Sequence, residues 1–296
     1  MDIPLTERLA VAAQYLLPQR LLTTAAGRLA GARGGAATTA AIRWFIGRYG
    51  VDMAEAAVPD PAAYATFNEF FTRALRPGAR PLAASGLLCP ADGAISQFGA
   101  IDGDLIFQAK GHDYRTVALL GGDAALAAHF HGGHFATIYL SPRDYHRVHM
   151  PCDGRLLRMI HVPGALFSVN PATARGVKGL FARNERVVAV FDHPDHGVWA
   201  LVLVGATIVG SMATVWHGTV NPPRPGTVRQ WDYGDGAPQL RQGDEMGRFQ
   251  LGSTVVLLFG RGPAALQWSA RWAPGAAVRM GETMAAWERP PRDVPA

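Results

Sequence analysis

The chain has 296 residues and a mass of 31.6 kDa, which fits one large domain or two modest ones, because a single core stops growing at roughly 250–300 residues. Apolar residues make up 49% and charged residues 17%, so a disordered chain is excluded. The net charge of +5 is not concentrated in a basic stripe with interleaved aromatic residues, which argues against a nucleic-acid partner. Cys89 and Cys152 cannot form a disulfide framework and lack the spacing of a zinc knuckle, so we expect a reducing compartment.

The first fifty residues carry a helical pattern. Between residues 5 and 49, apolar residues recur three and four positions apart, with interruptions near Pro18 and at Gly34-Gly35, which predicts amphipathic helices. Six arginines against two acidic residues give this segment an excess of positive charge that suits an anionic lipid surface. Two interpretations stay open: the helices cover the rest of the protein, or they lie in a membrane interface with arginines at the headgroups.

The N-terminus lacks the features of a secretory signal peptide. Residues 1–7 carry acidic side chains and do not lead into a clean apolar run. Together with the cysteine content, this predicts a protein that stays inside the cell.

The remaining pattern predicts one more helix and then a β-rich body. Thr66 and Glu69 fit a capping box, so a helix is expected to begin there and to end before Pro77. Beyond Pro81 short β-branched and aromatic segments alternate with turn residues; examples are residues 135–140, 186–191, 199–204 and 254–259. We therefore predict an α+β fold, with N-terminal amphipathic helices (residues 1–80) packed on a β-rich catalytic body (residues 81–296).

Residues 197–220 could be mistaken for a membrane span. The segment has no charged residue apart from neutral His217 and reaches the ~20 residues that a span needs. Glycine, threonine and serine dilute its hydrophobicity, and β-branched residues flank Gly205. We interpret it as two buried strands with a bend between them.

Histidine-rich segments raise the question of a metal site. His129, His131 and His134 stand in the sequence HFHGGH, but their spacing is not that of a helical zinc motif, and a tetrahedral site needs a further ligand in a defined place. We interpret HFHGGH as a surface loop and predict no metal site.

Three other segments carry groups that could act together. His146 and His149 lie in SPRDYHRVHMP after an apolar strand, Asp92 lies in the turn sequence PADG, and Ser253 follows glycine at the start of the run TVVLLF. An aspartate, a histidine and a serine can supply an orienting carboxylate, a base and a nucleophile. By spacing alone the pattern is weak, because Asp-Gly is usually a turn and Gly-Ser a bend.

The resemblance to a family is more specific. The segments PADGAIS, LSPRDYHRVHMPCDG, PGALFSVN, LFARNERV, LVGATIVGS and EMGRFQLGSTVVLLF together resemble the bacterial phosphatidylserine decarboxylases that carry a pyruvoyl group. The resemblance runs from the N-terminal helices through Phe259 and fades after it. It implies that the chain cuts itself between Gly252 and Ser253, with Asp92 and His149 as charge-relay partners of Ser253 and His146 as a neighbouring substrate-site residue.

The resemblance also implies the cofactor. Cleavage would convert Ser253 into an N-terminal pyruvoyl group, which forms a Schiff base with the substrate amine and accepts the electrons released with carbon dioxide. His149 or His146 would return a proton to the product. No pyridoxal phosphate is expected, because neither Lys110 nor Lys178 has the sequence context of a Schiff-base lysine. No metal is expected either, for the reason given above for the histidines.

The implied substrate stays in the bilayer through its acyl chains, so the resemblance favours the interfacial interpretation of residues 1–50. We expect a peripheral protein on the cytoplasmic face of the cell membrane, whose long and short chains stay associated after cleavage; a homodimer is compatible with this. Arg147 is a candidate contact of the lipid phosphate and Phe167 of the acyl chains. Further candidates for acyl-chain contacts are Phe67, Phe70, Phe71 and Leu166.

Two other functions use the same sequence features differently. A serine hydrolase would keep Ser253 within an intact chain and would need an oxyanion-hole signature, such as a serine elbow, which we do not find. A non-catalytic membrane adaptor would need none of Asp92, His149 and Ser253. Substitution of those residues separates the adaptor from both enzymes.

Overall fold

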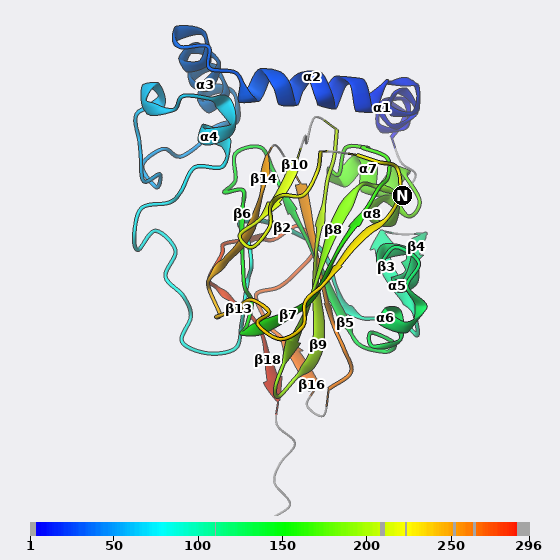
Figure 1. Cartoon of the computed structure of the whole chain (residues 1–296). Coiled ribbons are helices and arrows are strands. Elements are labelled where there is room, and N and C mark those ends of the chain that lie inside the picture. Colours follow the sequence, from blue (N-terminus) through cyan, green and yellow to red (C-terminus); the bar gives the residue numbers. More distant parts are fainter. Residues whose placement is uncertain are drawn as a thin grey trace, which may run out of the picture.

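The computed structural model describes residues 4–109, 111–207, 211–222, 224–250, 253–262 and 265–288, and of Ser253 only the backbone. Helices at the N-terminal end are followed by a body made mainly of antiparallel strands (Figure 1). The α+β class is therefore confirmed. Gly252, where cleavage is predicted, lies outside the described residues, as does Lys110.

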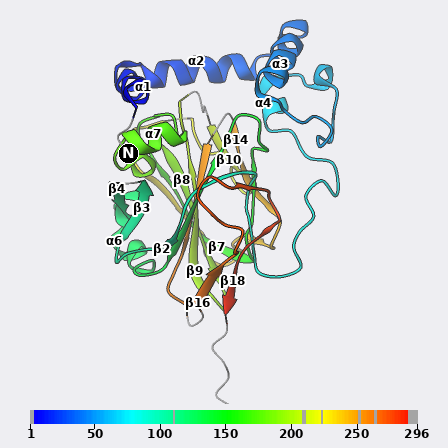
Figure 2. The same cartoon turned by 180° about the vertical axis from the view of Figure 1, so that it is seen from behind.

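Three helices open the chain and lie at one end of the body, as both side views show (Figures 1 and 2). They are α1 (Leu5–Leu16), α2 (Gln19–Gly31) and α3 (Ala36–Tyr49). The breaks fall at Pro18 and at residues 32–35, where the sequence predicts them. Side chains that hold the helices to the body include Gln14 and Gln19: Gln14 Oε1 accepts from the amide of Ser168 and Gln19 Oε1 from that of Leu166, both at 2.8 Å.

The predicted helix start at Thr66 is confirmed. After a 3-10 turn η1 (Pro61–Ala63), Thr66 caps α4 (Phe67–Phe71), and its Oγ1 accepts from the Glu69 amide at 3.1 Å. The Glu69 carboxylate reaches back to the amide of Ala65, one residue earlier than a capping box requires. Helix α4 ends at Phe71, well before Pro77, and the chain continues as an extended segment toward the body.

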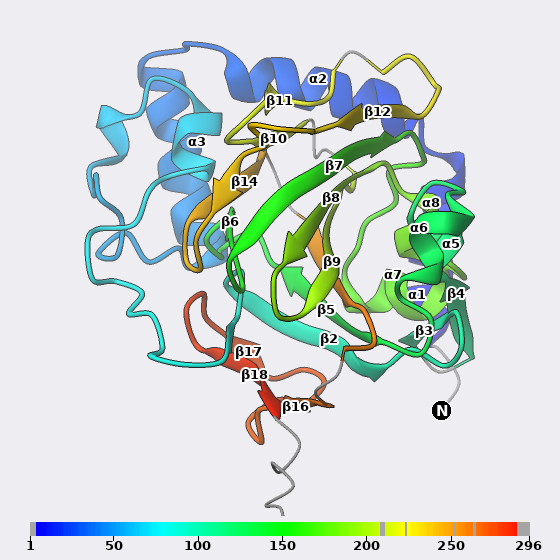
Figure 3. The same ribbon diagram turned by 60° about the horizontal axis from the view of Figure 1, so that its bottom comes forward.

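The largest sheet forms the centre of the body. Its strand order is β12-β7-β8-β9-β15-β5-β2-β17, with β13 also pairing with β7, and every pairing is antiparallel. The sheet curls around its own interior (Figure 3). The strands are β2 (Gly93–Ala100), β5 (His134–Leu140), β7 (Gly154–Val162), β8 (Arg186–His193), β9 (Gly197–Val204), β12 (Arg229–Asp232), β13 (Gln239–Leu240), β15 (Ser253–Phe259) and β17 (Ala277–Val278).

Smaller elements surround this sheet. A second sheet has the order β11-β10-β14-β6, a third the order β1-β18-β16, and β3 pairs with β4. Their bounds are β1 (Leu87–Leu88), β3 (Leu105–Ala109), β4 (His112–Arg115), β6 (Arg147–His149), β10 (Ser211–Thr214), β11 (Gly218–Thr219), β14 (Glu245–Gln250), β16 (Ala265–Trp268) and β18 (Thr283–Glu288). The short helices are α5 (Thr116–Leu119), α6 (Ala124–Ala128), α7 (Pro171–Gly176) and α8 (Leu180–Arg183).

Strand β15 is a central, buried strand of the large sheet. It is paired on one side with β9 and on the other with β5, and residues 254–259 are all buried. A short run of apolar and β-branched residues without alternation is what a strand covered on both faces needs. The predicted strand at 254–259 is thus confirmed, and Ser253 stands at its first position.

The charge-free segment 197–220 forms the two predicted buried strands and, in addition, a short exposed strand, β11. It contains β9, β10 and β11, and the change of sheet between β9 and β10 follows Gly205. Across the part of the chain that the structure describes, no helix has the length and hydropathy needed to cross a bilayer.

Candidate active site

The predicted cleavage point lies where β5 ends and β15 begins. The Cα of Ser253 lies opposite that of Leu140, the last residue of β5. The chain then turns at Ser141, whose amide and hydroxyl both donate to the Asp144 carboxylate at 2.7 Å. The turn that leads to both histidines is therefore anchored beside the first residue of β15.

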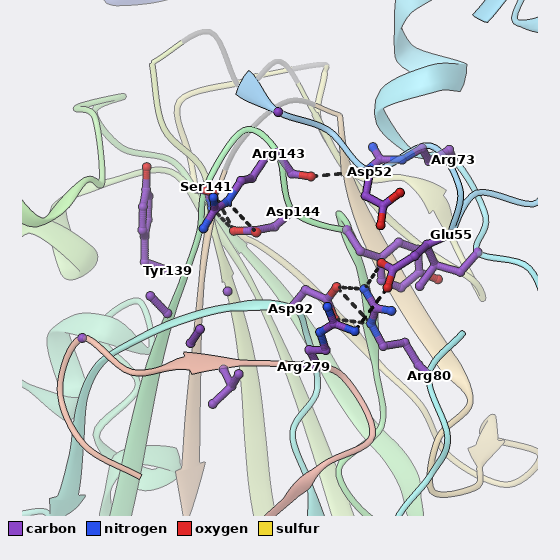
Figure 4. A pocket seen from close by; sticks show the side chains of 18 residues that line it. Asp52, Glu55, Arg73, Arg80, Asp92, Tyr139, Ser141, Arg143, Asp144 and Arg279 are labelled. Atoms are coloured by element: carbon purple, nitrogen blue, oxygen red, sulfur yellow. Dashed lines mark hydrogen bonds and ion pairs between the residues drawn. The ribbon is translucent and has the colours of Figure 1, made fainter. Parts of the chain in front are cut away.

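Asp92 is buried in the turn that enters β2, where an arginine holds it. Arg80 Nε donates to both carboxylate oxygens, at 3.0 and 3.1 Å, and Arg80 Nη2 donates to Oδ2 at 2.5 Å. The amide of Met280 donates to Oδ1 at 2.9 Å. This arrangement is a bidentate, charge-assisted clamp, and Figure 4 shows it on the wall of a pocket of about 430 Å³.

Arg80 also binds Glu55, which lies in the loop after α3. The distance from Nη2 to Glu55 Oε2 is 2.7 Å, and Arg279 approaches the other Glu55 oxygen at 3.2 Å. The hydrogen bond from Arg80 lowers the pKa of Glu55. Burial opposes the charge on Arg80, but its two carboxylate partners raise its pKa overall. Two carboxylates and two arginines thus form an ion-pair network that joins the loop after α3 to the pocket.

Removing Arg80 is expected to destabilise the fold strongly. Arg80→Met leaves the buried Asp92 without its cation, and breaking a buried pair in this way costs about 3–5 kcal/mol. The matched control is Arg115→Met: Arg115 pairs with Asp104 at 2.8 Å, but its side chain is 66% exposed, against 6% for Arg80. That loss should stay within about 1 kcal/mol. Urea unfolding of both variants measures the loss in the free energy of unfolding. Equal losses in the two variants would contradict the role of Arg80 as the cation that holds Asp92.

His149 is held in one tautomer, but not by Asp92. Its Nδ1 lies 2.8 Å from the carbonyl oxygen of Gly243, and its Nε2 lies 3.0 Å from the Tyr145 hydroxyl. A carbonyl can only accept, so Nδ1 carries the proton and Nε2 accepts from Tyr145. Burial lowers the pKa of His149, against opposing contributions from the Gly243 hydrogen bond and from the charges of Glu245 and Asp92. His149 is therefore a neutral imidazole with a basic Nε2.

The structure brings Asp92 and His149 into adjacent segments but gives each its own partners. The His149 amide donates to the carbonyl of Pro90 at 2.8 Å, which aligns β6 with the turn that carries Asp92. Among the described residues no hydrogen bond joins the two side chains. Gly243 orients the imidazole, whereas the sequence assigned that task to Asp92. Tyr145 lines the same pocket as Asp92.

His146 is fully buried and uncharged. Its Nε2 lies 3.1 Å from the Ser141 carbonyl oxygen, and its ring stacks on Phe71 with centroids 4.1 Å apart. Its own carbonyl accepts from the Phe249 amide at 3.0 Å. Burial, with a smaller contribution from the charge of Arg73, lowers the pKa of His146 to about 3. His146 thus lies between the turn after β5 and the strand that leads to residue 253, and stays neutral near pH 7.

The predicted lipid-contact residues have other contacts. Arg147 Nε donates to the Thr72 carbonyl at 2.9 Å, and Nη1 pairs with Glu245 at 2.8 Å, so its guanidinium is engaged. Phe167 is buried and lies against Tyr15 and Arg183, with centroid distances of 4.8 and 5.0 Å. The remaining candidates, Phe67, Phe70, Phe71 and Leu166, are buried or half-buried, and the three phenylalanines pack around Phe45.

The residues that could suggest other cofactors are dispersed. Over the described ranges, no group of three or more His, Cys, Asp or Glu side chains is placed to hold a metal ion. His129 and His131 are exposed, in agreement with a surface loop, and His134 starts β5. Lys178 is exposed between α7 and α8. Cys89 and Cys152 are buried free thiols.

Comparison with known proteins gives similarity over almost the whole chain. The family profile described as phosphatidylserine decarboxylase matches residues 67–286, and a second, described as PSD, matches residues 9–50. A phosphatidylserine decarboxylase proenzyme of Azoarcus sp. (strain BH72) is 70% identical over 280 residues, covering 95% of this chain and 96% of the relative. Proteins of the same name from Acidovorax ebreus (strain TPSY) and Dechloromonas aromatica (strain RCB) are 70% and 63% identical, each over 95% of this chain and 98% of the relative.

Proposed function

Because the chain belongs to the phosphatidylserine decarboxylase family, we propose that it removes carbon dioxide from phosphatidylserine and releases phosphatidylethanolamine. The observation that carries this proposal is the identity of 63–70% to decarboxylase proenzymes over nearly their full length. Incubating the purified protein with phosphatidylserine vesicles tests it, by the release of carbon dioxide and the appearance of phosphatidylethanolamine. Release of free serine or of fatty acid instead would indicate a hydrolase.

The word proenzyme in the relatives' names denotes a precursor that must be processed. We propose that this chain processes itself between Gly252 and Ser253, with the Ser253 hydroxyl attacking the carbonyl of Gly252 so that an ester replaces the peptide bond. β-Elimination then releases the Gly252 carboxylate and leaves a dehydroalanine, which water converts to the pyruvoyl group with release of ammonia. Glycine suits this position because it lacks a Cβ that would hinder the approach. His149 accepts the serine proton at Nε2 once the Tyr145 hydroxyl, which donates to that nitrogen at 3.0 Å, releases it, and the Gly243 carbonyl keeps Nδ1 protonated so that Nε2 remains the basic nitrogen.

Asp92 supports this step through its charge. Taking the serine proton turns His149 into a cation, and the negative charge of Asp92 raises the pKa of His149, although burial dominates the other way. Arg80 fixes where that charge lies. In this proposal Asp92 stabilises the protonated histidine without a direct hydrogen bond.

The described residues around position 253 fit the ketone that processing would leave there. Thr254 is fully buried, and its Oγ1 has no hydrogen-bond partner among the described residues, so a donor is available beside the start of β15. When present, a pyruvoyl group supplies an electron sink for decarboxylation. His146, neutral and fixed by Ser141 and Phe71, shapes the site next to it.

The two processed chains have structural reasons to stay together. Cleavage before residue 253 would leave β15 between β9 and β5, with complete pairing on both sides. Residues of β15 fill the core, so separation would expose the five apolar residues 255–259. We propose that the long and short chains remain one folded unit.

We propose that the N-terminal helices attach the protein to a membrane surface. Large apolar side chains on all three are exposed: Leu9, Leu16, Leu21, Leu29 and Trp44 are 61–87% exposed. An amphipathic helix that presents leucines and arginines together is suited to lie in the interface of an anionic bilayer.

Charged substitutions on this surface are expected to abolish membrane binding. Each leucine that enters the interface contributes on the order of 1 kcal/mol or more, so replacing Leu16, Leu21 and Leu29 together by glutamate should weaken binding to phosphatidylglycerol vesicles by at least about 100-fold. Vesicle sedimentation measures this. The control is Leu105→Glu on β3, an exposed leucine away from the helices. Equal binding of the triple variant and the control would overturn the membrane assignment.

A further inference from the structure

A second pocket lies between α2 and the ends of β10 and β14. It has a volume of about 380 Å³, and Figure 1 shows α2 passing above these strand ends. The pocket is separate from the one that Asp92 lines. Its polar lining includes Thr24, Arg28, Asn68, Ser211, Arg224 and Gln250.

The lining offers hydrogen-bond donors in excess. Arg28 is exposed and makes no ion pair within the described ranges, and neither the Gln250 nor the Asn68 side-chain amide makes a hydrogen bond there. The hydroxyls of Thr24 and Ser211 already donate to backbone carbonyls of Arg20 and Asn221. The Arg28 guanidinium and the side-chain amides of Gln250 and Asn68 are therefore available to the pocket, and the amides bring acceptor oxygens as well as donors: Asn68 Oδ1 is buried without a partner among the described residues.

Among the described residues, the pocket has one positive charge that no carboxylate balances. Arg224 is balanced by Glu185, whose carboxylate it approaches at 2.8 Å, whereas Arg28 has no such counterpart. A phosphodiester carries one negative charge and accepts several hydrogen bonds, and a guanidinium is the donor best matched to it. The excess donors and the single charge thus match a phosphodiester.

The pocket is near the reacting residue. Gln250 ends β14, opposite Ser211, and Ser253 begins β15. Three residues span at most about 10 Å. In phosphatidylserine the phosphate and the amine are separated only by the oxymethylene and the α-carbon of the serine. The membrane-facing leucines of α2, Leu21 and Leu29, belong to the helix that roofs the pocket.

We propose that this pocket binds the phosphodiester of the lipid substrate, with Arg28 supplying the charge. This rests on the proposed function and names the part of the chain that recognises the headgroup. Arg147, the candidate from the sequence, is engaged with Glu245 and Thr72, whereas Arg28 is free to bind and lies between the proposed membrane surface and residue 253.

Binding of a soluble lipid that is not a substrate tests the pocket without relying on activity. Dihexanoyl phosphatidylglycerol carries the same phosphodiester but no amine, and calorimetry below its micelle concentration gives its Kd. Arg28→Gln should weaken binding about 10-fold or more, as expected for a lost charge-assisted hydrogen bond, and Arg28→Lys should recover part of it. The control Arg33→Gln, an exposed arginine just after α2, should leave Kd unchanged.

Turnover of dihexanoyl phosphatidylserine provides the second readout. Arg28→Gln should raise KM about 10-fold with kcat within about twofold of the wild type, while self-cleavage proceeds normally. Unchanged Kd and KM in Arg28→Gln would overturn the proposal, as would equal losses in Arg33→Gln. Inorganic phosphate that binds in an Arg28-dependent way while phosphatidylglycerol does not would assign the pocket to free phosphate. If the wild type releases no carbon dioxide, the proposed function fails, and the phosphatidylglycerol Kd still decides the pocket.

Discussion

Ser253→Ala is expected to remain a single uncut chain and to release no carbon dioxide from phosphatidylserine. The same side chain serves twice in the proposed chemistry, first as the nucleophile that attacks Gly252 and then as the source of the pyruvoyl ketone. Removing a nucleophile of this type typically lowers the rate by about 10⁴-fold or more. Without cleavage the ketone does not form, so decarboxylation is lost in full. Gel electrophoresis and trapped carbon dioxide measure the two losses separately.

The matched control is a serine outside the large sheet, Ser269→Ala. Ser269 follows β16 in a different sheet from β15, and the variant should cut itself and turn over like the wild type. A Ser253→Ala protein that still forms phosphatidylethanolamine would contradict the role of this residue. So would one that is cut at its normal position.

His149→Ala should slow self-cleavage by about 10³–10⁴-fold, because it removes the base that takes the serine proton. The pH profile of the wild type tests the same assignment. A base must be neutral to act, and burial lowers the pKa of His149 below its usual value near 6.5. The cleavage rate should therefore stay level from pH 8 down to about 6.5 and should fall only at lower pH. Cleavage of freshly refolded protein, followed on gels across this range, gives both results.

His146→Ala is the comparison for His149. His146 is buried against Phe71 and its pKa is lowered to about 3, so it is not the group that gains a proton near neutral pH. The variant should still be cut, because His149 supplies the base for that step. A His146→Ala chain that folds and stays uncut would reverse the assignment of the two histidines.

Much of the fold follows from local sequence. Pro18 and Gly34-Gly35 end helices because proline lacks an amide donor and glycine favours non-helical backbone, and the structure breaks the helices there. The uninterrupted apolar run after Ser253 requires burial on both faces, and β15 is the strand that has it. The neighbours of β15 could not be predicted in this way. Its pairing with β9 and β5 depends on contacts far apart in the chain.

The candidate site could be predicted only in part. Motifs identified Asp92, His149 and Ser253, but no local pattern marks the groups that orient them. Arg80 stands in a Pro/Gly-rich linker that resembles a surface turn, and Gly243 orients His149 from 94 residues away through its backbone carbonyl. Tyr145 lies within one of the quoted motifs, but the motif does not show what its hydroxyl contacts. The fold brings Nε2 of His149, in β6, within hydrogen-bond distance of that hydroxyl.

The most direct test of the account is an intact-mass spectrum of the purified, denatured protein. Cleavage at Gly252 predicts two masses, for residues 1–252 and residues 253–296, with the shorter chain starting in a ketone and lacking a free α-amine. Reaction with a carbonyl reagent should shift the mass of that chain alone. A single chain near 31.6 kDa from a preparation that releases carbon dioxide from phosphatidylserine would contradict the self-processing mechanism.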